Sequence, residues 1–137
     1  MAAAIMRREG GVPRVLLAQR PAGKPLAGLW EFPGGKLEVG EQPEECLRRE
    51  LREELSIEVD AVGLVPLTFA SHALDGEKHL LMPLWQVTSF DGEPVGAEGQ
   101  ELSWATAEQL SEYAMPPADA PLLPVVQRAM QSLGENE

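Results

Sequence analysis

The sequence has one cysteine, no long hydrophobic run and few basic residues, and each shortage excludes a class of protein. A single cysteine cannot form an internal disulfide, so a disulfide-stapled secreted fold is excluded and a reducing cytoplasm is the expected location. No apolar run approaches the roughly 18 residues of a membrane span, and the short run over 2–6 does not make a signal peptide.

Basic residues are outnumbered two to one by acidic ones. With 11 Lys and Arg against 22 Asp and Glu, the formal net charge is −11. This charge argues against a nucleic-acid polymer or an anionic membrane as partner. A small polyanion stays compatible with it, because a bound metal ion can reverse the sign of the charge locally.

The sequence also lacks internal repeats, low-complexity tracts and linkers. Its 137 residues, 44% of them hydrophobic, are enough for one domain with a substantial core. We therefore expect a single soluble domain over 1–137. A monomer and a homodimer are both compatible with the sequence.

Turn residues and hydrophobic patterning divide the chain into short elements. Apolar runs predict strands over 2–6, 12–19, 30–32, 78–89 and 101–105, and one bent strand or two over 57–71. Start and stop signals predict helices over 43–55, 106–113 and 120–133, the last capped by Asp119 and ended by Gly134. This order is typical of an α+β sandwich with a mixed β-sheet between helices.

The most informative stretch, 34–57, runs from a glycine pair into the first predicted helix. At 100° per residue, Glu50, Glu53 and Glu54 fall within one arc of about 100°, beside a stripe of leucines. Carboxylates crowded on one helix face repel one another, and a bound divalent cation would remove that repulsion. The alternative interpretation of these glutamates is a solvent-exposed helix face stabilised by ion pairs, because Arg49 lies four residues from both Glu45 and Glu53.

A hard cation such as Mg²⁺ takes oxygen ligands and commonly keeps substrate phosphates among them. The glutamates could supply such ligands from one rigid helix, and the glycines at 34 and 35 let backbone carbonyls approach closely. Arg49 lies beside the acidic arc and could hold one carboxylate through a bidentate contact.

The spacing of the whole stretch follows a family pattern, G-x5-E-x7-R-E-U-x-E-E-x-G-U. The matching positions are Gly35, Glu41, Arg49, Glu50, Leu51, Glu53, Glu54 and Ile57. Ser56 stands where the pattern has glycine, at a helix end that favours positive φ, so we expect modest strain there without ligand contact. The stretch resembles the Nudix box. The segments LLAQRPAGKPLAGLWEFPGGK, GAEGQELSW and PPADAPLL also resemble MutT-type Nudix hydrolases, in the same order.

The resemblance implies an α/β/α sandwich that hydrolyses a nucleoside diphosphate linked to another group, with Mg²⁺ or Mn²⁺ as cofactor. In MutT-type members, water cleaves a nucleoside triphosphate to the monophosphate and pyrophosphate. By position, the implied metal ligands are the Gly35 carbonyl, Glu50, Glu53, Glu54 and Glu98. The implied catalytic residues are Glu50, Glu53, Glu98 and Arg49, and Glu41 would pair with Arg49 to brace the helix. The family does not use one glutamate as general base throughout, so that assignment stays open.

Substrate contacts are expected outside the box. The resemblance places Arg20 against phosphate or base, and Lys24 is a weaker phosphate candidate. Asp119 is expected to cap a helix and contact the base, accepting either the paired N–H donors of guanine or the single amino group of cytosine.

The leading substrate is therefore 8-oxo-dGTP, for an enzyme that sanitises the nucleotide pool. The alternative substrate is CTP or a modified dCTP, which the local sequence PADAPLL favours. A non-catalytic Nudix binding module is disfavoured because all box glutamates are present. A hydrolase of ADP-ribose or dinucleoside polyphosphates is disfavoured by the MutT-like segments.

Overall fold

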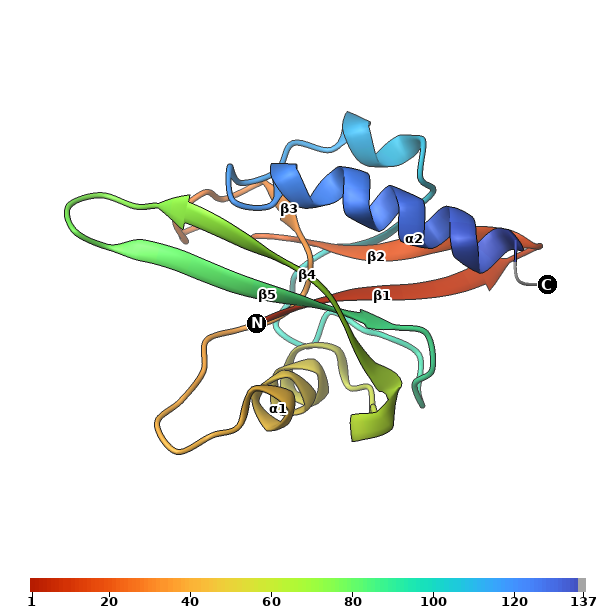
Figure 1. Cartoon of the computed structure of the whole chain (residues 1–137), viewed down its shortest axis with the longest axis horizontal. Coiled ribbons are helices and arrows are strands. Elements are labelled where there is room, and N and C mark those ends of the chain that lie inside the picture. The colour runs from red at the N-terminus through yellow and green to blue at the C-terminus, as the bar shows by residue number, and fades with distance from the viewer. Residues whose placement is uncertain (136–137) are drawn as a thin grey trace.

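The computed structural model describes residues 1–135 as a mixed β-sheet with an α-helix on each face (Figure 1). The strands in this part of the chain are β1 (Ala2–Glu9), β2 (Val12–Gln19), β3 (Trp30–Glu31), β4 (Leu64–Ala73), β5 (His79–Val87) and β6 (Leu102–Ala105). Its helices are α1 (Pro43–Leu55) and α2 (Leu123–Glu135), with 3-10 turns at Ala61–Gly63, Gln109–Glu112 and Ala120–Leu122. The predicted α+β sandwich is confirmed.

β1 lies at the centre of the sheet, whose order is β3-β2-β1-β5-β4, with β6 paired to β2. The first half of β1 pairs in parallel with β5, from Ala2 opposite Leu84 onward. Its second half pairs antiparallel with β2, from Met6 opposite Val15 onward. The remaining pairs are antiparallel, which makes the sheet mixed.

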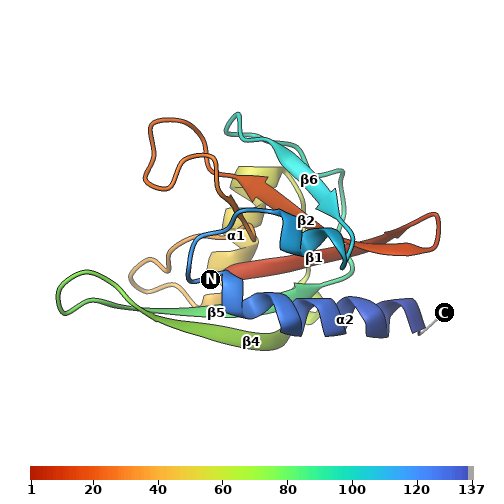
Figure 2. The ribbon, with the colours of Figure 1, turned by 90° about the horizontal axis from the view of Figure 1, so that it is seen from above.

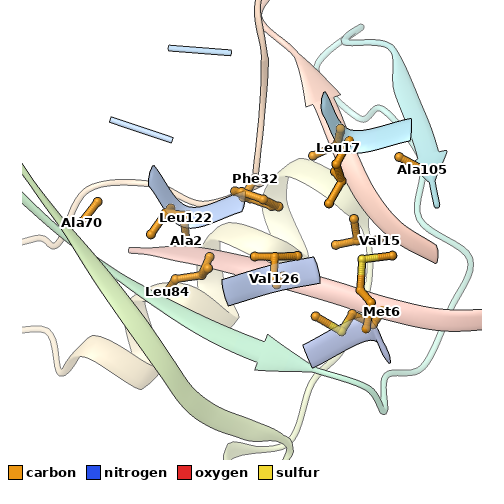
Figure 3. Close-up of a cluster of buried hydrophobic side chains, with 13 residues drawn as sticks. Ala2, Met6, Val15, Leu17, Phe32, Ala70, Leu84, Ala105, Leu122 and Val126 are labelled. Carbon is orange, nitrogen blue, oxygen red and sulfur yellow. The ribbon is translucent and has the colours of Figure 1, made fainter. Parts of the chain in front are cut away.

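Two apolar cores lie on opposite faces of the sheet, because alternate strand residues point to opposite sides. The core under α1 comprises Ala3, Ile5, Leu16, Leu47, Leu51, Leu55, Ile57, Val59, Leu64 and Val87. The core under α2 includes Ala2, Met6, Val15, Leu17, Phe32, Leu84, Leu122 and Val126, all labelled in Figure 3. The leucine stripe predicted on the first helix is therefore the side that α1 buries.

Three element predictions need correction. The strand expected over 57–71 is present only as β4, which starts after the 3-10 turn at Ala61–Gly63 and has an irregularity between Pro66 and Thr68. Proline cannot donate to a strand ladder, and β4 is an edge strand, where this is tolerated.

The helix expected over 106–113 is only a short 3-10 turn. Its capping box is present: the Thr106 amide donates to Gln109 Oε1 at 3.0 Å, and the Gln109 amide donates to Thr106 Oγ1 at 3.3 Å. The turn ends because the Ala114 carbonyl accepts from the Trp30 amide at 2.8 Å, and Pro116 follows. The last helix begins at Leu123 and includes Gly134, which was expected to end it.

Two loops far apart in the sequence meet at one end of the sheet. Figure 2 shows the β2–β3 loop beside the segment that leads into β6. Between them lies a hollow of about 490 Å³, lined by residues of 19–28 and 99–101. Within residues 1–135, no helix is long and apolar enough to cross a membrane.

Candidate active site

The turn from β3 into α1 brings the Gly35 backbone against the Glu50 side chain. A Cβ atom at Gly35 would overlap the Glu50 carboxylate, so this close approach requires glycine. The Gly35 carbonyl accepts from the Met1 amino group at 2.8 Å. The residue whose carbonyl oxygen is expected to bind a metal therefore lies next to the Glu50 carboxylate.

Arg49 braces the start of α1 through Glu41. Its Nε and Nη2 donate to the two Glu41 carboxylate oxygens at 2.6 and 3.0 Å, so the two residues that the resemblance pairs form a bidentate contact. This contact lowers the pKa of Glu41 to about 2. Arg49 Nη1 also donates to Glu50 at 3.0 Å and to Glu53 at 3.3 Å. One guanidinium thus holds the preceding loop and two helix carboxylates.

Negative charge is crowded around Glu54. Burial, the carboxylates of Glu50 and Glu98, a hydrogen bond with Glu50 and the charge of Glu31 raise the pKa of Glu54 to about 8. An opposite charge within a few ångströms would lower that pKa again. The structure therefore brings Glu50, Glu54 and Glu98 into one electrostatic cluster.

Glu53 shares Arg49 Nη1 with Glu50 and is the more exposed of the two carboxylates. Its side chain is 58% exposed and its carboxylate contacts Arg49, which is the i,i+4 ion pair of the alternative interpretation. Among residues 1–135, no three acidic, His or Cys side chains already converge in a geometry that would hold a metal ion. The helix thus combines a solvated ion pair on its rim with a crowded acidic group beside it.

Arg20 is engaged within its own loop. Its Nη1 donates to both Glu31 oxygens, at 3.0 and 3.2 Å, and its Nε donates to the Pro25 carbonyl at 2.7 Å. Backbone bonds from the Arg20 amide to Leu29 and from the Gly28 amide to Arg20 close the loop. Lys24 lies exposed on the same loop.

Asp119 is buried, with only 5% of its surface exposed. The helix-cap prediction is wrong: its side chain makes no cap bond, and its Oδ2 instead accepts from the Phe32 amide at 3.3 Å. The reason is the 3-10 turn that follows, which points Asp119 toward β3 rather than α2. Burial raises the pKa of Asp119 to about 6; Glu31 adds to this rise, while the Phe32 amide and Arg20 oppose it.

Glu31 is the residue that the sequence interpretation missed. It bonds to Arg20 and raises the pKa values of both Glu54 and Asp119, so it lies between the acidic cluster and the Asp119 end of the site. A signal was present, since an acidic residue between Trp30 and Phe32 in an apolar strand needs a partner.

The family comparison agrees with this geometry. The model of the NUDIX domain matches residues 1–126. The chain belongs to the Nudix family. It is 43% identical over 122 residues to a CTP pyrophosphohydrolase of Escherichia coli, covering 88% of this chain and 85% of that protein. It is 35% identical over 132 residues to an 8-oxo-dGTP diphosphatase of the same organism, covering 93% and 95%.

A solved MutT structure, from work on Aliivibrio salmonicida and Vibrio cholerae, has the same fold as this Nudix chain. The TM-score is 0.77 at 34% identity, covering 93% of this chain and 94% of that one. The assignment to the Nudix hydrolases is therefore confirmed. Nudix hydrolases use divalent metal ions, and two features of this structure suit one: the close approach of Gly35 to Glu50, and the crowding of carboxyl groups around Glu54.

Proposed function

We propose that the protein is a Mg²⁺-dependent nucleoside triphosphate pyrophosphohydrolase, which converts a triphosphate and water to a nucleoside monophosphate and pyrophosphate. The observation that carries this proposal is the approach of the Gly35 backbone to the Glu50 carboxylate, which only glycine permits. The raised pKa of Glu54 supports it, because a bound divalent cation would relieve the repulsion among these carboxyl groups and commonly keeps phosphate oxygens among its ligands.

In this proposal, the Gly35 carbonyl and the carboxylates of Glu50, Glu53, Glu54 and Glu98 would hold the metal ion. Mn²⁺ satisfies the same oxygen ligands. A bound divalent ion supplies positive charge against the triphosphate. Glu50, Glu53 or Glu98 accepts the proton of the attacking water, and the carboxylate least engaged by metal is the best base. Water oxygen forms the new bond to phosphorus, and the anhydride bond between the α- and β-phosphates breaks.

Arg49 supports this chemistry by fixing α1 to the loop through Glu41 and by orienting Glu50. Arg20 was expected to contact the phosphate or the base directly, and its contacts within the loop change that proposal. Because its guanidinium bonds Glu31 and Pro25, we propose that it shapes the loop and presents only its remaining donors to phosphate. Lys24, exposed on that loop, is free to approach the phosphates from solvent.

The base is proposed to be read by Asp119. Oδ2 accepts from the Phe32 amide, and the carboxylate keeps acceptor capacity on both oxygens, so either base is compatible with it. The 43% identity to a CTP pyrophosphohydrolase supports CTP and modified dCTP ahead of 8-oxo-dGTP in this proposal.

Turnover of a nucleotide panel tests the proposal. Purified protein with Mg²⁺ is given CTP, 5-methyl-dCTP, 8-oxo-dGTP, dGTP and ADP-ribose, and pyrophosphate or phosphate release is measured. We expect pyrophosphate release, highest with a cytosine nucleotide. Faster turnover of 8-oxo-dGTP than of the cytosine nucleotides would make 8-oxo-dGTP the preferred substrate again. Turnover of ADP-ribose alone would refute the proposed hydrolysis of nucleoside triphosphates.

A matched pair of glutamate variants tests the metal site. Glu53→Gln should lower kcat at least tenfold, whereas Glu45→Gln, an exposed glutamate on the same helix, should leave kcat within about twofold. Equal kcat values in the two variants would contradict the assignment of Glu53. The single cysteine favours the cytoplasm as the place of this activity, where it would keep modified nucleotides out of DNA.

A further inference from the structure

The segment 95–100 docks on the end of α1. The last carbonyls of a helix lack partners within the helix and must find them elsewhere. Here the Leu55 carbonyl accepts from the Val95 amide at 3.0 Å, and the Glu54 carbonyl accepts from the Ala97 amide at 3.1 Å. A Cβ atom at Gly96 would overlap the Gln100 carbonyl, so the segment is tightly folded.

Gln100 closes this segment with both ends of its side-chain amide. Its Nε2 donates to the Glu54 carbonyl at 3.0 Å, and its Oε1 accepts from the Glu98 amide at 2.9 Å. One side chain therefore links the backbones of two glutamates, one on α1 and one on a loop more than 40 residues away. The Val95 and Ala97 amides already hold the segment to α1, and Gln100 adds a bond to the Glu98 amide itself.

We propose that Gln100 is a positioning residue, which clamps the Glu98 peptide to the last turn of α1 and so keeps the Glu98 carboxylate beside that of Glu54. The role rests on the proposed function, in which both carboxylates serve the metal. Only an amide offers a donor to one backbone and an acceptor to the other at this length. Asparagine is one methylene shorter and would not span the two peptides.

The test compares Gln100→Met with Gln127→Met. Both lose a half-buried glutamine amide, and Gln127 donates only to the Ala107 carbonyl, at 2.9 Å, on the other face of the sheet. We expect Gln100→Met to lower kcat about 10- to 100-fold with KM within about threefold, since misplacing a catalytic group by about 1 Å costs of that order. Gln127→Met should keep the wild-type kcat.

A double-mutant cycle separates positioning from loss of stability. If Gln100 acts through Glu98, Gln100→Met should lower kcat no further in a Glu98→Gln background. An equal drop in both backgrounds would overturn the proposal. So would a Gln100→Met variant whose kcat stays within twofold of wild type.

Amide hydrogen exchange of the metal-free protein gives a readout that does not depend on activity. Exchange over 95–101 should accelerate in Gln100→Met and not in Gln127→Met; equal exchange would refute the clamp. If the wild type hydrolyses no nucleotide of the panel, the proposed function fails. A titration with Mn²⁺ alone then decides the proposal: weaker binding by Gln100→Met than by Gln127→Met supports it, and equal binding refutes it.

Discussion

Replacing Ser56 with glycine should stabilise the protein, because Ser56 holds a left-handed backbone at the end of α1. Its φ and ψ are 59° and 34°, and its amide donates to the Arg52 carbonyl at 3.0 Å. A residue with a side chain in this region costs about 1–2 kcal/mol. Glycine offsets about 0.5–1 kcal/mol of the gain through the larger entropy of its unfolded chain. The expected net gain is about 0.5–1 kcal/mol.

Differential scanning calorimetry measures this gain. For a chain of 137 residues the unfolding entropy is about 0.3 kcal/mol per degree, so Tm should rise by about 2–3 °C. Ser56→Ala is the control, since it removes the hydroxyl but keeps the Cβ atom in the same backbone conformation. Its Tm should stay within about 1 °C of wild type. A Ser56→Gly protein that melts no higher than Ser56→Ala would refute the strain argument.

Three further predictions concern the charged residues of the site. Arg49 depresses the pKa of Glu41 from 4.5 to about 2, so the stability from this pair is present above about pH 4.5 and is lost as the pH falls toward 2. Glu41→Gln should lower Tm at pH 7 and flatten its decline between pH 4.5 and 2; an unchanged pH dependence of Tm would contradict this. Burial raises the pKa of Asp119 from 3.8 to about 6, so the folded state loses stability as the pH rises through this interval. In urea unfolding, the free energy of unfolding of Asp119→Asn should therefore exceed that of wild type by about 1–3 kcal/mol at pH 7 and equal it below pH 4. A variant less stable than wild type at pH 7 would contradict this prediction. Glu54→Gln removes one charge from the crowded cluster, so the metal-free variant should melt above wild type at pH 8, where Mg²⁺ should raise the Tm of wild type only. An equal Mg²⁺ effect on both proteins would remove Glu54 from the metal site.

Local signals predicted the first helix correctly. Pro43 at the start, the leucine stripe and the change at Ser56 all act within a few residues, so α1 was predicted with its observed bounds. The Glu41–Arg49 pair was expected from the resemblance to the Nudix box, and the structure contains both of its hydrogen bonds.

Local signals misled where a distant segment competed for the same groups. The capping box at Thr106 forms its two bonds, yet the turn ends early because the Ala114 carbonyl bonds the Trp30 amide of β3. Asp119 has the position of a helix cap, but its carboxylate accepts a hydrogen bond from the amide of Phe32, which is 87 residues away. Neither partner can be read from the neighbouring sequence.

The sequence by itself determined the family, the bounds of α1 and the glutamates available for metal, because these depend on residue type and on spacing along one chain segment. The tertiary structure alone decided which carboxylates meet. It brought Glu50, Glu98 and Glu31 near enough to raise the pKa of Glu54, and gave Glu53 an exposed ion pair with Arg49, which also bonds Glu50. The physical reason is that electrostatic crowding depends on distances through space, and the loops carrying Glu31 and Glu98 reach Glu54 only when the sheet brings them together.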